Sequence, residues 1–174
     1  MKRMAAIVLA QAALAFAAAP PLPAPVGADF PTLSAYSDAR FRKMLLHVYD
    51  VSLWTSAAQW SPQGLFALDI RYARAVSGRD LARRSIEEMR NQGHADAALL
   101  NRWGQAMTRV FPDVEAGDRL VGVNVDGREA RFYGARGFLG AIDDPGFARA
   151  FFDIWLDERT SEPALRRELL KLPR

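Results

Sequence analysis

The stretch FFDIWLDERTSEPALRRELL (residues 151–170) joins a dense aromatic cluster to a charged segment and a second, shorter apolar run. The apolar positions around it form two adjacent rows at helical spacing. One row holds Phe147, Phe151 and Ile154, and the other holds Ala148, Phe152 and Trp155. The pattern predicts a helix over 144–156, buried on more than one side, and a final helix capped by Ser161. Core packing is the default interpretation of the aromatic cluster, and a ligand-cavity wall is the sharper one.

Two apolar segments lie further towards the N-terminus and predict strands. Residues 40–55 are apolar on both alternating faces and contain no glycine or proline, which predicts one long central strand or two strands with a bend. Residues 65–76 alternate more regularly. One face of this strand should hold Phe66, Leu68, Ile70 and Tyr72, and the other Ala67, Asp69, Arg71 and Ala73.

Helical and turn patterns follow these strands. Residues 77–92 and 96–110 have helical spacing, and the first begins with a capping pattern at Ser77. The dipeptide Asp126-Gly127 lies between two apolar runs and predicts a hairpin. The order of strands, two helices, a hairpin and two more helices predicts an α+β fold with a large antiparallel sheet and helices packed on one face.

The N-terminus has the pattern of a secretion leader. Lys2 and Arg3 precede a short alanine-rich apolar run, and small residues follow it. We predict a signal peptide over 1–28 and a single domain over 29–174, with cleavage before Asp29. Cleavage after Ala17 or Ala19 and an uncleaved anchor remain alternatives, although the apolar run is short for a membrane span.

Charge and composition exclude several classes of function. The formal charge is +3, but two basic residues fall within the predicted leader, whereas all 20 acidic residues follow it, so the remaining domain would carry only +1. This balance, without an aromatic and basic stripe, argues against a nucleic-acid partner. The chain has no cysteine, which excludes disulfides, thiol catalysis and a zinc-thiolate site. A leader and no disulfide fit a periplasmic protein without a stable membrane span after cleavage.

The common catalytic motifs are absent from the sequence. There is no G-x-S-x-G elbow and no phosphate-binding glycine loop. His47 and His94 are far apart and have no metal-ligand spacing. We therefore predict no metal, no cofactor and no assignable catalytic residue.

Arginines and tyrosines within the apolar strands are the remaining candidates for a binding site. Arg40 and Arg42 begin the long strand segment, Tyr49 lies in its middle, and Tyr72 lies on the apolar face of the next strand. A guanidinium beside phenolic hydroxyls in an apolar cleft would suit a carboxylate or enolate oxygen. The alternative is that the arginines are solvated and both tyrosines are ordinary core residues.

Four stretches carry a resemblance to a known family: HVYDVSLW (47–54), FPDVEAGDRLVGV (111–123), residues 130–170 and the leader. Together they resemble the bacterial chalcone isomerase-like proteins over nearly the whole mature chain. The resemblance implies an open-faced β-sandwich of the chalcone isomerase type, with a ligand cleft between sheet and helices. Plant relatives cyclise chalcones, and related non-catalytic members bind fatty acids.

Most residues of the plant enzyme's site are not retained in this sequence. By the resemblance, its essential arginine falls on Phe41, between Arg40 and Arg42, and its active-site threonine falls on Tyr49. Its tyrosine and asparagine fall on Leu81 and Glu88, and its specificity pair falls on Ile154 and Trp155. Cyclisation requires a network that stabilises the enolate, so chalcone isomerase activity is not expected.

Three hypotheses follow for the function. The preferred one is a periplasmic, non-catalytic binder of a small apolar acid such as a fatty acid. Its predicted ligand-binding residues are Arg40, Arg42, Tyr49, Tyr72, Ile154 and Trp155. The second is an isomerase or lyase that uses an Arg/Tyr oxyanion site on a small carbonyl substrate. The third is an envelope interaction protein whose cleft is filled by its own side chains.

Overall fold

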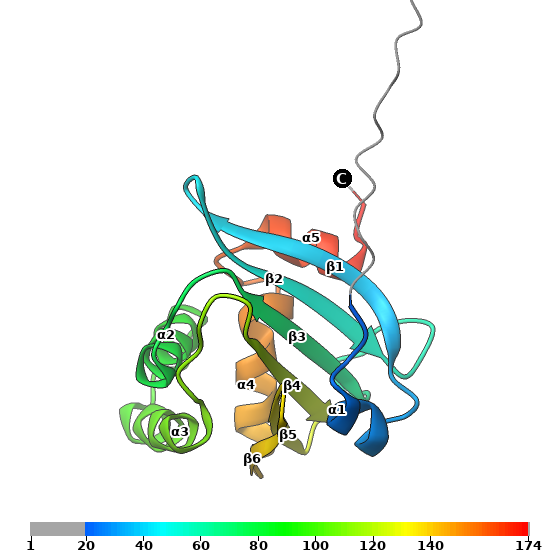
Figure 1. The fold of residues 1–174 in the computed structure, drawn as a ribbon. Coiled ribbons are helices and arrows are strands. Elements are labelled where there is room, and N and C mark those ends of the chain that lie inside the picture. The colour runs from blue at the N-terminus through cyan, green and yellow to red at the C-terminus, as the bar shows by residue number, and fades with distance from the viewer. Residues whose placement is uncertain (1–19, 174) are drawn as a thin grey trace, which may run out of the picture.

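The computed structural model describes residues 20–173. Within this range, helices and strands follow one another along the chain in the order drawn in Figure 1. The elements are α1 (Ala24–Asp29), β1 (Ser34–Lys43), β2 (Leu46–Thr55), β3 (Phe66–Tyr72), α2 (Gly78–Asn91), α3 (Ala97–Val110), β4 (Arg119–Val125), β5 (Glu129–Gly134), β6 (Gly137–Ile142), α4 (Pro145–Leu156) and α5 (Pro163–Leu170).

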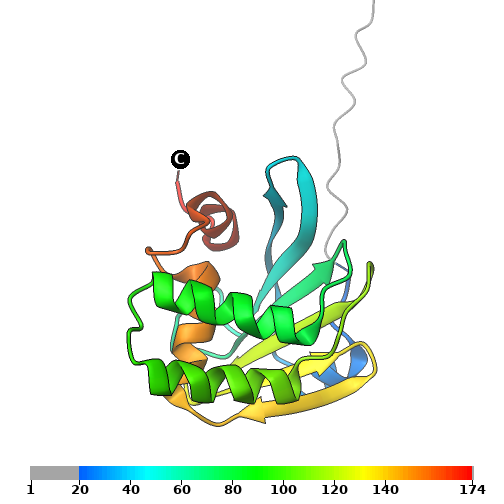
Figure 2. The same cartoon turned by 90° about the vertical axis from the view of Figure 1, so that its left-hand side faces the viewer.

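The strands form one antiparallel sheet in which the spatial order is the sequence order, β1 to β6. Helices α2, α3 and α4 lie on one side of this sheet, and α5 packs along the edge strand β1 (Figures 1 and 2). This arrangement confirms the predicted α+β class and the open antiparallel sheet. The short helix α1 lies on the opposite side and was not predicted.

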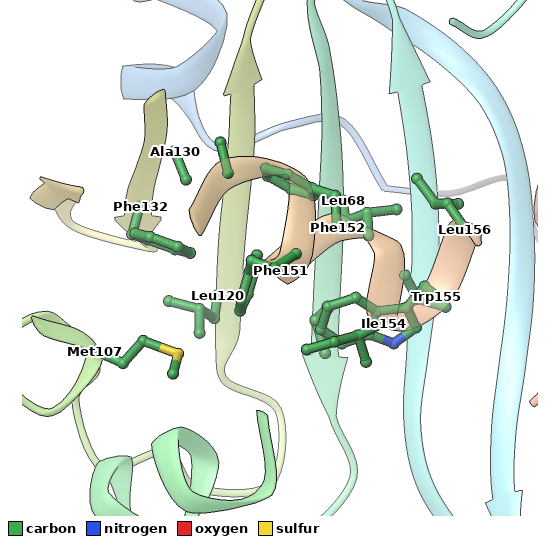
Figure 3. Close-up of a cluster of buried hydrophobic side chains, with 14 of the residues drawn as sticks. Leu68, Met107, Leu120, Ala130, Phe132, Phe151, Phe152, Ile154, Trp155 and Leu156 are labelled. Carbon is green, nitrogen blue, oxygen red and sulfur yellow. The ribbon is translucent and has the colours of Figure 1, made fainter. Parts of the chain in front are cut away.

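The main core lies between the sheet and α4. Figure 3 shows the side chains of α4, among them Phe151 and Phe152, packed against residues of the strands. Gly122 on β4 makes room for them, since a Cβ at that position would lie 3.3 to 3.4 Å from three phenylalanine rings. The predicted helix over 144–156 is therefore confirmed, and Asp144 caps it by accepting a hydrogen bond from the Phe147 amide at 3.0 Å.

The opposite sheet face carries a smaller apolar cluster and a polar network. The predicted alternation of β3 is confirmed, because Phe66, Leu68, Ile70 and Tyr72 belong to the main core. On the other face Asp69 is fully buried, and it accepts hydrogen bonds from Arg119 Nε at 3.1 Å and Arg71 Nη1 at 3.3 Å. Two guanidinium groups thus compensate one buried carboxylate.

The segment 40–55 belongs to two strands, the second of the two predicted alternatives, but a chain reversal rather than a bend separates them. A tight turn at Met44 and Leu45 joins β1 to β2, and Met44 adopts a positive φ of 57°. Sequence reasoning missed this turn because neither residue is a usual turn former. The turn at Asp126-Gly127 was predicted, and both residues have positive φ as a type I′ hairpin requires.

The helix ends agree with the sequence in most cases. Ser77 caps α2 by accepting a hydrogen bond from the Asp80 amide at 3.1 Å, as predicted. The prediction that Ser161 caps the last helix is wrong. Helix α5 begins at Pro163, its N-cap position is Glu162, and the cap makes no side-chain hydrogen bond.

The predicted boundary between leader and domain falls at the end of α1. Val26 on this helix is fully buried, and Tyr133 of β5 donates a hydrogen bond to Asp29 at 2.7 Å. Residues 21–30 therefore pack on the sheet. Most of the predicted leader, including the alternative cleavage sites at Ala17 and Ala19, lies outside the described residues, so cleavage stays a prediction. None of the described helices is long and apolar enough to cross a membrane.

Candidate functional site

An aromatic cluster lies where the ends of β2 and β3 meet the last turn of α4. Tyr49 is at its centre: its ring stacks on Phe41 at a centroid distance of 4.8 Å and meets the edge of Tyr72 at 6.4 Å. Trp155 Nε1 donates a hydrogen bond to the Tyr49 hydroxyl at 2.9 Å. Strand register explains the first two contacts, because Phe41 pairs with Tyr49 and Tyr49 pairs with Tyr72. We call Phe41, Tyr49, Tyr72 and Trp155 the tyrosine cluster.

The two tyrosines remain neutral phenols at physiological pH. Burial raises the pKa of Tyr49 far above its usual value, and the charges of Glu162 and Glu88 raise it further. Burial, followed by the influence of Tyr49, raises the pKa of Tyr72 in the same way. The Tyr49 hydroxyl accepts from Trp155 and keeps its own proton, so it is available as a hydrogen-bond donor.

This burial makes stability sensitive to alkaline pH. Because the folded-state pKa values of Tyr49 and Tyr72 lie above the ordinary 10.0, the stability linked to them is complete below about pH 10 and is lost as the pH rises further. We expect the urea midpoint to fall between about pH 9 and about pH 11, and to fall less in the Tyr49→Phe/Tyr72→Phe variant. Equal pH dependence of the variant and the parent would contradict this assignment.

Two carboxylates lie near the tyrosine cluster. Glu88 of α2 has one carboxylate oxygen, Oε2, that is buried and has no hydrogen-bond partner among the described residues. Burial raises the pKa of Glu162, the charge of Glu88 raises it further, and Lys43 acts in the opposite direction. An unpartnered buried oxygen is costly unless a donor reaches it. Glu88 can therefore accept a hydrogen bond from a bound molecule.

The structure does not bring Arg40 to the tyrosine cluster. Its Nε contacts Asp50 Oδ1 at 2.6 Å, and Asp50 also contacts His47 Nε2 at 3.2 Å. Successive strand residues point to opposite faces, so Arg40 and Asp50 face away from Phe41 and Tyr49. Arg42 is exposed beside the β1–β2 turn and makes no ion pair among the described residues. Among the described residues, neither Arg40 nor Arg42 makes a hydrogen bond to the Tyr49 or Tyr72 hydroxyl.

The two predicted residues of α4 lie at its C-terminal end. Ile154 and Trp155 are each 9% exposed and belong to the main core (Figure 3). Thr160 fixes this end of the helix by donating a hydrogen bond to the Ile154 carbonyl at 2.7 Å. The structure therefore brings together Tyr49, Tyr72 and Trp155, with Ile154 in the same core.

Two residues of the site were missed from the sequence. Phe41 was considered only as the position of a lost arginine, yet it stacks on Tyr49. Recognising the hairpin turn would have revealed this pairing. Glu162 lies in the connection before Pro163, and nothing in its local pattern indicated that it would approach Glu88.

Two hollows on the described surface lie elsewhere. A groove of about 630 Å³ runs between α2 and α3, and a smaller hollow of about 380 Å³ lies near the start of α2. Neither is lined by the tyrosine cluster. The described residues also hold no group of three or more His, Asp or Glu side chains suited to a metal ion.

Comparisons with known proteins agree on the fold. A family model described as "Chalcone isomerase-like" matches residues 37–171. A search of curated proteins finds no match. Among solved structures, the chain is similar to a fatty-acid binding protein from Arabidopsis thaliana, with a TM-score of 0.61 and 11% sequence identity, over 80% of this chain and 87% of that chain. At this identity the likeness establishes the fold alone.

Proposed function

The chain belongs to the chalcone isomerase-like family, and we propose that it binds a small apolar acid, such as a fatty acid, without converting it. The observation that carries the proposal is the composition of the tyrosine cluster. Its polar atoms are neutral phenols and an indole, with Glu88 and Glu162 nearby. Arg40, which would have stabilised an enolate, is bound to Asp50 on the other sheet face. As part of the same proposal, the binder is secreted to the periplasm.

The isomerase or lyase alternative is weaker for the same reason. Its mechanism requires a cation or several donors around a developing oxyanion. Leu81 lies at the position of the family's catalytic tyrosine, and its side chain packs against the main core. The carboxylates of Glu88 and Glu162 would oppose negative charge on a substrate rather than stabilise it.

The acid should bind in its protonated form. A ligand carboxylate beside Glu88 and Glu162 would add a third negative charge, which is unfavourable at low dielectric. A protonated carboxyl group can instead donate to the unpartnered Glu88 Oε2 and accept from the Tyr49 hydroxyl. The alkyl chain would then lie against the apolar side chains of Tyr72, Ile154 and Trp155.

This mode of binding predicts that affinity rises as the pH falls. We expect dodecanoic acid to bind more tightly at about pH 5 than at about pH 8, because a proton is taken up with the ligand. The Glu88→Gln variant should bind dodecanoic acid about tenfold more tightly than the parent at the higher pH, since a tenfold change in affinity corresponds to about one pKa unit. Its affinity should also change less with pH. Calorimetric titration measures both.

The matched control is the neighbouring Glu87→Gln. Glu87 is exposed, is paired with Arg83 and lines the groove between α2 and α3 rather than the tyrosine cluster, so its loss should leave the ligand affinity unchanged. If dodecanoic acid does not bind at either pH, the proposed function is wrong. If it binds with equal affinity at both, the protonated head group is wrong. Turnover of a chalcone, followed by its absorbance, would support the enzyme alternative.

A further inference from the structure

The turn between β1 and β2 exposes three consecutive large apolar side chains. Met44 is 92% exposed, Leu45 97% and Leu46 56%. We call these three residues the hairpin tip. The hairpin extends beyond the body of the molecule in both views, so the hairpin tip is its outermost part (Figures 1 and 2). Isolated exposed apolar residues are common, but a contiguous run marks an interaction site.

The fold does not require apolar residues at the hairpin tip. Met44 adopts a positive φ of 57°, a conformation in which glycine or asparagine is usual. The side chains of Met44 and Leu45 are almost fully exposed and so add little to the core. A polar turn would therefore satisfy the fold at lower cost, and the apolar residues point to a role outside the folded chain.

Basic residues adjoin the hairpin tip. Arg42 and Lys43 directly precede it, both are exposed, and neither makes an ion pair among the described residues. No acidic residue occurs between Arg40 and Val48, and Asp50 is already bound by Arg40 and His47. Apolar side chains at the end of a projection with exposed cations behind them match the layers of an anionic bilayer, in which acyl chains lie beneath negative headgroups.

We propose that the hairpin tip inserts into an anionic lipid bilayer, with Arg42 and Lys43 at the headgroups. This contact would direct the tyrosine cluster towards the membrane, because Phe41 of the same hairpin stacks on Tyr49. The proposal goes beyond ligand binding and does not depend on it.

Sedimentation with phosphatidylglycerol-containing vesicles tests the contact. The parent protein should bind them more strongly than vesicles of phosphatidylcholine alone. We expect Met44→Ser and Leu45→Ser each to weaken the partition about tenfold, and Arg42→Gln and Lys43→Gln about fivefold each. The matched control is Phe138→Ser, which removes a 57% exposed aromatic side chain from β6 and should change nothing.

A label at the hairpin tip separates insertion from other kinds of contact. The chain has no cysteine, so Leu45→Cys provides a single thiol for an environment-sensitive fluorophore. Its emission should shift to the blue with phosphatidylglycerol vesicles, whereas a label on Phe138→Cys should not respond. The proposal is wrong if the emission of the label at Leu45→Cys does not shift with phosphatidylglycerol vesicles. It is also wrong if the Met44→Ser/Leu45→Ser double variant binds these vesicles as strongly as the parent. Self-association without vesicles that the same double substitution abolishes would instead make the hairpin tip an interface between two copies.

Discussion

The Gly78→Ala substitution should lower the free energy of unfolding by about 4 kcal/mol or more, which corresponds to a fall of about 10 °C in melting temperature. A Cβ on Gly78 would lie 2.2 Å from the Phe111 carbonyl oxygen and 2.9 Å from the Pro112 oxygen. Both are backbone atoms and cannot rotate away. The Gly78 amide also donates a hydrogen bond to Asp113 Oδ1 at 2.8 Å, which holds the start of α2 against the segment that follows α3. Thermal unfolding followed by circular dichroism measures the effect.

Gly104→Ala is the matched control for this prediction. Gly104 lies in the middle of α3, and its added Cβ would make an ordinary contact with Ile86 at 3.4 Å. Alanine favours a helix interior over glycine by about 0.5–1 kcal/mol, so this variant should be slightly more stable than the parent. A similar melting temperature for both variants would contradict the prediction, because it would show that the backbone at Phe111 and Pro112 can move away from the added Cβ at little cost.

The Gly78 contact also illustrates which features the sequence could predict. The cap at Ser77 follows from local residue pattern, because its partner is only three residues away. The space available at Gly78 depends on Phe111, at the far end of the next helix, and no local pattern reports that distance. The helix over 144–156 could be predicted because the information is local. The spacing of its own apolar residues indicates both the helix and its burial.

The residues of the candidate site also fall into those whose position follows from local sequence and those whose position depends on distant residues. The burial of Tyr72, Ile154 and Trp155 in the main core could be predicted, because strand parity and helical spacing orient each of them locally. The position of Arg40 depended on the turn at Met44, which reverses the chain and pairs Arg40 with Asp50. A bulge between Phe41 and Arg42 shifts the register beyond it. The sequence left one strand and two strands with a bend both open for 40–55, so it could not predict that Phe41 pairs with Tyr49 and Arg40 with Asp50.

Phe151→Ala should lower the free energy of unfolding by about 3–5 kcal/mol, the usual loss for a buried aromatic residue. Phe151 lies on the sheet-facing side of α4 and is 4% exposed. Ring centroids lie 5.1 to 5.9 Å away on every side, from Phe111, Phe132, Phe147, Phe152 and Trp155. Urea unfolding measures the loss, and Phe138→Ala, at a 57% exposed position, should cost less than about 1 kcal/mol.

The same variant tests which residues of α4 the proposed ligand contacts. If the ligand lies against Tyr49 and Trp155, Phe151 does not touch it but packs on Trp155 at a ring-centroid distance of 5.4 Å, so Phe151→Ala should weaken the binding of dodecanoic acid less than a substitution of Trp155 itself. Trp155→Leu should weaken binding more strongly, because it also removes the donor that orients the Tyr49 hydroxyl. A Phe151→Ala variant that loses affinity as strongly as Trp155→Leu would place the ligand deeper, among the phenylalanines of α4.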